Sequence, residues 1–245
     1  MNKFICGLTL AAITSGAALA ATPVGIANVF GAKSWEQAKN PPYGMYSFAL
    51  GKNAEVKNVT RNVVPANLGG VYADGRFFAI EGIATSASSF ITNYIYDATT
   101  WEKITDFRGE NITAFDMAWD QTTGNVYGYF HSFDTGEEFF GTINLNTGTT
   151  TRISQLPFVA YGMGADVEGQ IYAVAKNGDF YKIDKTTGTS QLIAKTAAAS
   201  AWTTSGTVDS ATRTFYFATC NDTRSELYAI NLDSGEATML SLIHI

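Results

Sequence analysis

Cysteine and histidine are scarce in this chain, which has 2 of each among its 245 residues. Once the N-terminal segment that carries Cys6 is set aside, Cys220 has no partner for an intramolecular disulfide, so the fold has to depend on packing. A zinc or copper site needs several imidazole or thiolate ligands, and His131 and Cys220 are too few. The composition therefore excludes a fold stabilised by disulfide bonds and a metal site built from histidine or cysteine ligands. We expect neither a metal ion nor a cofactor.

Long apolar runs are also rare, and the main one lies at the N-terminus. A basic start over residues 1–3 is followed by an apolar run over residues 4–19 and by the small-residue sequence Ala18-Leu19-Ala20. The run is too short to span a bilayer, and the pattern predicts a signal peptide over residues 1–20, cleaved after Ala20. A buried N-terminal helix is the alternative. We expect a secreted protein that is periplasmic, cell-surface or extracellular, with residues 21–245 forming one domain.

Positive charge is limited as well. The chain has 16 Lys and Arg residues against 22 Asp and Glu residues, a net charge of −6. Nucleic acids and anionic membrane surfaces bind proteins through clustered Lys and Arg side chains. We therefore expect no nucleic-acid partner and, after signal cleavage, no insertion into a membrane.

What the chain does have is a unit of about 45 residues that recurs four times. In each copy an Asp closes the first strand, a short turn follows, and the second strand is rich in aromatic residues. The Asp residues are 46, 46 and 43 residues apart, and they are Asp74, Asp120, Asp166 and Asp209. A third strand, a polar turn with Gly and a fourth strand complete each copy. This order predicts four-stranded antiparallel blades, and the period predicts a β-propeller.

Residues 46–59 look like the last two strands of an earlier blade, whose first two strands we place within residues 25–43. The predicted fold is therefore all-β, a propeller with four clear blades and one partial blade. The units resemble those of secreted bacterial propeller-repeat proteins, in the broad group of quinoprotein-like and YVTN-type propellers. The resemblance covers residues 45–240 and implies the fold. It implies no single function, because sensors, scaffolds, adhesins and enzymes all use such propellers.

The last six residues, 240–245, resemble the translation of a sequencing-library adapter. From this likeness we expect a C-terminally truncated fragment, in which these six residues are an artefact and further blades are missing. The alternative is a genuine last strand, because Met239 and Leu240 continue a strand pattern.

Residues suited to catalysis are few. A Ser-His-Asp arrangement would have to use His131, which we interpret as a loop residue, and the sequence has no Gly-x-Ser-x-Gly motif. The four repeated Asp residues each begin a turn, where a carboxylate accepts hydrogen bonds from backbone N–H groups. Turn capping therefore explains their recurrence better than catalysis.

The loops on one face of the predicted propeller differ between copies, which is what a binding surface on a repeated scaffold requires. Aromatic and acidic residues lie at or near the entry to successive first strands on this face, and they are Phe115, Asp116, Tyr161 and Trp202. Aromatic rings beside polar groups suit contacts with a sugar or a peptide. The alternative is that the rings plug the channel or pack between blades.

We therefore predict an exported, non-catalytic binding module that presents this face to a glycan, a peptide or an envelope protein. The alternative is an enzyme on the same scaffold, such as a lyase, a cyclotransferase or a quinone-dependent dehydrogenase, with Asp116 and Tyr161 as acid and base. The binding module is favoured because the sequence shows no catalytic constellation.

Overall fold

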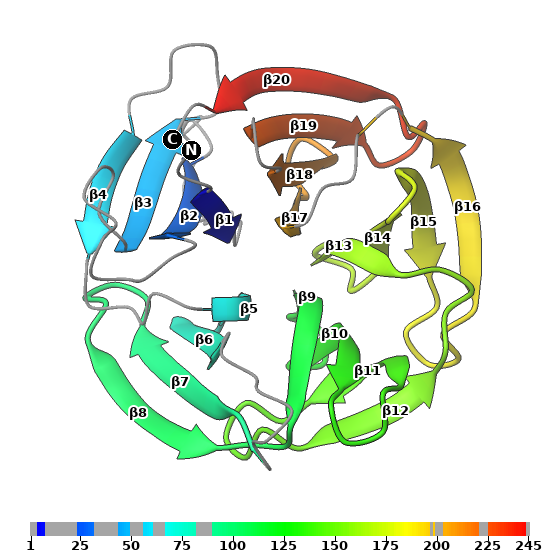
Figure 1. The fold of residues 1–245 in the computed structure, drawn as a ribbon. Coiled ribbons are helices and arrows are strands. Elements are labelled where there is room, and N and C mark those ends of the chain that lie inside the picture. Colours follow the sequence, from blue (N-terminus) through cyan, green and yellow to red (C-terminus); the bar gives the residue numbers. More distant parts are fainter. Residues whose placement is uncertain are drawn as a thin grey trace.

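The computed structural model describes residues 4–7, 24–31, 44–49, 56–60, 67–81, 90–196, 198, 203–220 and 225–243. Within these ranges every regular element is a β-strand, and the strands form five antiparallel four-stranded sheets. Figure 1 shows the sheets arranged around a central axis as the blades of a propeller. The prediction of an all-β propeller with four-stranded blades is confirmed. No helix in the described ranges is long and apolar enough to cross a membrane.

Each blade uses four consecutive strands, with the first innermost and the fourth outermost (Figure 1). Blades 1 and 2 comprise β1 (Phe4–Gly7), β2 (Val24–Gly31), β3 (Gly44–Ala49), β4 (Val56–Thr60), β5 (Asn67–Ala73), β6 (Arg76–Glu81), β7 (Thr92–Asp97) and β8 (Lys103–Arg108). Blades 3 and 4 comprise β9 (Ile112–Asp120), β10 (Asn125–Ser132), β11 (Glu138–Ile143), β12 (Thr150–Ser154), β13 (Ala160–Ala165), β14 (Ile171–Ala175), β15 (Asp179–Ile183) and β16 (Ser190–Lys195). Blade 5 comprises β17 (Thr203–Asp209), β18 (Thr214–Cys220), β19 (Ser225–Asn231) and β20 (Ala237–Ile243).

The hydrophobic core lies between the blades, and strand β10 shows why the second strands are rich in bulky residues. Val126 and Phe130 pack in a cluster shared with blade 2, whereas Tyr127 and Tyr129 pack in a cluster shared with blade 4. Successive side chains of a strand point to opposite faces of its sheet, so a blade buried on both faces needs large residues at nearly every position. Phe130 is fully buried and Tyr129 is 2% exposed.

The repeated Asp residues cap their turns in three of the four copies, as predicted. One carboxylate oxygen of Asp120 accepts the N–H of Thr122 at 2.9 Å, and the same pattern holds at Asp166 and Asp209. Asp74 differs, because it forms a two-residue turn with Gly75 between the paired residues Ala73 and Arg76. Both turn residues have positive φ, 47° and 74°, which is the geometry that an Asp-Gly hairpin favours.

Blade 1 corresponds to the predicted partial blade. Its last two strands, β3 and β4, lie where they were expected, but its first two do not both do so. Two strands were expected within residues 25–43, but only β2 lies there. The innermost strand, β1, comes earlier in the chain and pairs with β2 from Phe4↔Gly31 to Gly7↔Asn28. The β1 segment lies inside the predicted signal peptide. Blade 1 is therefore completed by residues 4–7, which the predicted cleavage after Ala20 would remove.

The turn between the third and fourth strands is tight, and it presses against the preceding blade. Gly148, Gly188 and Gly235 occupy the same place in blades 3 to 5, each with φ near 70°. A Cβ at Gly188 would lie 1.8 Å from the Ser154 hydroxyl oxygen of blade 3. In blade 2 the position is Trp101, which has φ of 59° and is 5% exposed. Its ring packs 5.5 Å from that of Phe77, so blade 2 replaces the glycine with a buried aromatic side chain.

Candidate functional site

Two of the predicted site residues, Phe115 and Tyr161, are placed by β-bulges. In blade 3, Tyr129 pairs with Asp116 and Phe130 pairs with Ala114, so Phe115 is the extra residue of β9. In blade 4 the register passes from Ala160 to Gly162 in the same way and leaves Tyr161 unpaired in β13. A bulge bends its strand and redirects a side chain, and such bulges are common next to functional sites.

The two bulged residues meet across the boundary between blades 3 and 4. The rings of Phe115 and Tyr161 stack with centroids 5.8 Å apart and an interplanar angle of 20°. Phe115 also packs 5.6 Å from Tyr129, and the Lys176 ammonium lies 5.9 Å from the centre of the Tyr161 ring. Phe115 and Tyr161 are half-buried and Lys176 is exposed. We call Phe115, Tyr161 and Lys176 the aromatic ledge.

Asp116 is next to Phe115 in sequence, but its carboxylate points to the propeller axis instead of the loop face. One carboxylate oxygen, Oδ2, accepts the backbone N–H of Met163 in blade 4 and of Gly206 in blade 5, each at 2.7 Å. The other, Oδ1, accepts the hydroxyl of Ser205 at 3.3 Å. The residue is 3% exposed. Asp116 therefore ties the inner strands of three blades together.

Burial raises the pKa of the Asp116 carboxyl to about 8, although the hydrogen bonds from Met163, Gly206, Met117 and Ser205 favour the charged form. The donors around the carboxyl come from strands of three blades, and the group is closed to solvent. This arrangement suits an interior tie between strands and does not give a carboxylate that a ligand on the loop face could reach.

Trp202, the fourth predicted site residue, lies outside the described residues. The described neighbour Thr204 donates its hydroxyl to the carbonyl oxygen of Tyr161, so blade 5 is anchored to the backbone of the ledge. The structure thus brings Phe115, Asp116 and Tyr161 close together, with two rings toward the loops and the carboxylate toward the axis.

Two features of this region escaped the sequence analysis. Lys176 was not singled out, although it lies in the loop between β14 and β15 on the predicted face. Tyr129 donates its hydroxyl to Glu138 at 3.4 Å, and burial together with that carboxylate raises its pKa to about 12. Lys176 directly follows the apolar strand β14, so the sequence places it at the start of a loop. That position was the signal that could have identified Lys176 as a site residue.

His131, the only histidine considered for catalysis, has a structural position in the sheet. His131 lies in β10 and not in a loop as predicted; it pairs with Glu138, and its ring packs edge-on against Phe133 at 5.0 Å. Within the described ranges, no three His, Cys, Asp or Glu side chains gather in a way that could hold a metal ion.

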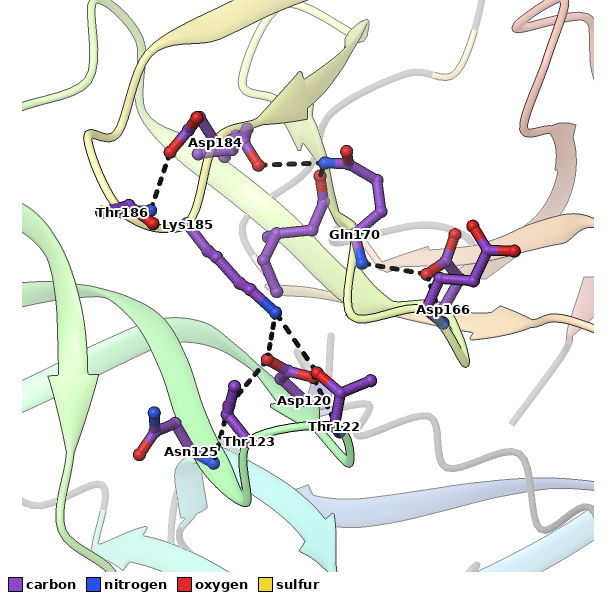
Figure 2. A network of polar contacts seen from close by, with 12 residues as sticks. Asp120, Thr122, Thr123, Asn125, Asp166, Gln170, Asp184, Lys185 and Thr186 are labelled. Carbon is purple, nitrogen blue, oxygen red and sulfur yellow. Dashed lines mark hydrogen bonds and ion pairs between the residues drawn. The ribbon is translucent and has the colours of Figure 1, made fainter.

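The opposite face carries the turns between first and second strands, and a polar network joins two blades there (Figure 2). Lys185, in the turn after β15, donates to the Asp120 carboxylate at 2.6 Å and to the Thr122 hydroxyl at 3.4 Å. Between the two faces, inner strands line an axial cavity of about 270 Å³, with Met117, Met163 and Gly206 among its lining residues.

Comparisons with known proteins agree with this architecture. No protein-family model matches the chain, and no curated protein matches it. A crystal structure of a nidogen/laminin complex is similar with a TM-score of 0.53 and 13% identity, over 81% of this chain and 74% of that chain. A putative TolB from Agrobacterium tumefaciens has a TM-score of 0.52 and 10% identity, over 81% of this chain and 74% of that chain.

A structural genomics protein of unknown function from Bacteroides thetaiotaomicron has a TM-score of 0.52 and 17% identity, over 71% of this chain. This chain covers 43% of the length of that protein. Identities this low show a shared fold and nothing narrower. The structure and its likeness to these proteins together identify the chain as a β-propeller repeat protein.

Proposed function

We propose that the chain is an exported, non-catalytic binding module that holds its partner on the loop face, at the aromatic ledge. The observation that carries the proposal is the stacking of Phe115 on Tyr161 across two blades, with centroids 5.8 Å apart. Both rings are half-buried, so the scaffold fixes their positions while part of each surface remains open.

Peptide segments of a partner protein fit this surface best. Rigid aromatic side chains dominate the binding energy of protein interfaces, and a neighbouring cation adds contacts to acidic or carbonyl groups. Lys176 provides that cation beside Tyr161. A glycan stacked on Tyr161 and an envelope protein bound over a wider area are the other partner classes that the sequence favoured, and the experiment below separates them from a peptide.

The chemistry of the site favours binding over catalysis. The predicted acid of the enzyme alternative, Asp116, is 3% exposed and accepts hydrogen bonds from two backbone N–H groups of other blades. A general acid or base has to come within hydrogen-bond reach of its substrate. One structural neighbour is described as a nidogen/laminin complex, which gives an example of a similar fold in an assembly of two proteins.

The test is a binding screen with the exported protein. Peptide and glycan arrays and detergent-solubilised envelope fractions are probed with the wild type and with the Phe115→Ala and Tyr161→Ala variants. We expect peptide binding that falls at least tenfold in either variant, because each loses one ring of the stack. Tyr94→Ala serves as the matched control, because Tyr94 is also half-buried and stacked, against Tyr96 in blade 2. Binding that is unchanged in both ledge variants, or the absence of binding to every probe, would overturn the proposal.

A further inference from the structure

A second concave site lies on the face opposite the aromatic ledge, between blades 2 and 3. It is a cleft of about 960 Å³, which is at the upper end of the range of about 300–1,000 Å³ typical of ligand sites. The turns after β5, β9 and β11 border it, so we call it the turn-face cleft.

The cleft has an apolar floor and a polar rim. Trp119, which is half-buried, lies on the floor together with Phe78 and Leu145. The Trp119 ring is held edge-on by Tyr72 at 6.5 Å. Amide and hydroxyl side chains make up most of the rim, with one residue of each charge; they include Asp74, Arg76, Gln121, Asn125, Asn146 and Thr149.

The corresponding place between blades 3 and 4 is closed by an ion pair. There Lys185 follows Asp184 in the turn after β15 and reaches the buried carboxylate of Asp120 at 2.6 Å. In blade 3 the same turn position, after Asn144, is Leu145, which cannot form such a bond and packs against the core between blades 2 and 3. The cleft between blades 2 and 3 therefore lacks the ion pair that joins blades 3 and 4 at the corresponding place.

Several rim groups are available to a ligand. Within the ranges that the structure describes, the side chains of Arg76, Gln121, Asn125 and Asn146 make no hydrogen bond to protein, and all four are exposed. Side-chain amides both donate and accept hydrogen bonds, and Arg donates in a planar fork. A ligand that presents many hydroxyl groups could use all of them.

We infer that the turn-face cleft binds a neutral oligosaccharide. A sugar ring has an apolar face, which stacks on an indole, and a rim of hydroxyl groups, which pair with amides, hydroxyls and a guanidinium. The two opposite charges of Asp74 and Arg76 leave the rim without a net charge, which selects against strongly anionic or cationic ligands. The cleft is large enough for several sugar units, so we expect an oligosaccharide and not a single sugar.

The experiment is isothermal titration calorimetry with neutral hexasaccharides, namely cellohexaose, maltohexaose, xylohexaose and chitohexaose, and with hexagalacturonic acid as the anionic comparison. We expect saturable binding of at least one neutral sugar and weaker or no binding of the acid. Trp119→Ala should weaken binding at least tenfold. Because Trp119 also packs against Tyr72, the double variant Arg76→Ala/Asn146→Ala, which changes only exposed rim residues, provides a second test with the same expected loss.

Two control variants separate this site from the loop face. Tyr161→Ala should leave sugar binding unchanged, and so should Lys195→Ala, an exposed residue of β16. The inference is overturned if none of the neutral sugars binds, if only the acid binds, or if binding survives both the Trp119 and the rim variants. A loss of sugar binding in Tyr161→Ala would instead assign the sugar to the aromatic ledge and also overturn the inference.

Discussion

Lys185 of blade 4 neutralises the buried carboxylate of Asp120 in blade 3. The Nζ–Oδ2 distance is 2.6 Å, and the two side chains are 27% and 0% exposed, respectively. Burial by itself would raise the pKa of Asp120, but the hydrogen bonds from Lys185, Thr122 and Thr123 outweigh that effect and lower it to about 2. The Lys185–Asp120 ion pair therefore joins two blades, and the charge of Asp120 depends on it.

The Lys185→Met variant should lose much of its stability at neutral pH, because a buried carboxylate remains without its cation. Breaking such a pair typically costs about 3–5 kcal/mol, which urea denaturation at pH 7 would measure. The wild-type pKa of Asp120 is depressed from 3.8 to about 2, so the stabilisation is present above about pH 4 and is lost as the pH falls toward 2. The difference in stability between the two proteins should accordingly shrink over that range.

Arg152→Met is the control for this comparison. Arg152 pairs with Glu137 at 2.9 Å, but both side chains are about half exposed, and exposed pairs contribute at most about 1 kcal/mol. A loss in Lys185→Met no larger than that in Arg152→Met would contradict the importance of the Asp120 pair.

Asp116 should make stability depend on pH in the opposite direction. Burial raises its pKa from 3.8 to about 8, so between these values the folded chain retains a proton that the unfolded chain has released. This contribution to stability is full below about pH 4 and is lost as the pH rises through 8. Asp116→Asn, which cannot titrate, should show a flatter pH dependence of the urea midpoint over this window. Asp106→Asn, at an exposed position of β8, should keep the wild-type slope; equal slopes in all three proteins would refute the assignment.

Two glycines with the same backbone conformation should respond differently to alanine. Gly188 and Gly136 have φ of 72° and 71°, so a Cβ strains both by about 1–2 kcal/mol. A Cβ at Gly188 would also collide with Ser154, whereas one at Gly136 meets nothing within 4 Å. Overpacking adds about 1–3 kcal/mol, so Gly188→Ala should lower the thermal unfolding midpoint clearly more than Gly136→Ala. Equal shifts would show that the turn can move away from blade 3.

Export should remove the innermost strand of blade 1. If cleavage follows Ala20, mass spectrometry of the secreted protein will find Ala21 at its N-terminus, and β1 will be absent. The β2 amides that pair with Phe4–Gly7 in the uncleaved chain should then exchange with solvent faster than in the precursor. Secreted protein that retains Met1 would contradict the predicted signal peptide.

Blades 3 to 5 were predictable because their signals are local, and blade 2 because its Asp74 keeps the 46-residue spacing to Asp120. An Asp that caps its own turn and a glycine with positive φ each leave a mark at a fixed place in the repeat, as at Asp120 and Gly188. In blade 1 the sequence over residues 25–43 shows no clear repeat pattern, and the first strand, β1, lies before this segment. The sequence pattern therefore predicted the presence of the blade but not the position of its first strand.

The candidate site was predicted less completely. Phe115 and Tyr161 were identified from their place at the entry of first strands, but their stacking depends on one extra residue in β9 and one in β13. A single inserted residue cannot be distinguished in a short strand with large residues on both faces. The inward direction of Asp116 could not be predicted either, because its partners, Met163 and Gly206, are backbone groups 47 and 90 residues away.

The tie made by Asp116 has a consequence for how the propeller unfolds. In open repeat arrays each unit contacts only its neighbours, so stability is a sum of terms between adjacent units and the ends can fray independently. Asp116 of blade 3 accepts hydrogen bonds from Met163 of the adjacent blade 4 and also from Gly206 of blade 5, which is not its neighbour in the chain order. Blade 5 therefore cannot detach without breaking the bonds from Gly206 and Ser205 to the buried Asp116 side chain, and blades 3 to 5 should open together as one cooperative unit.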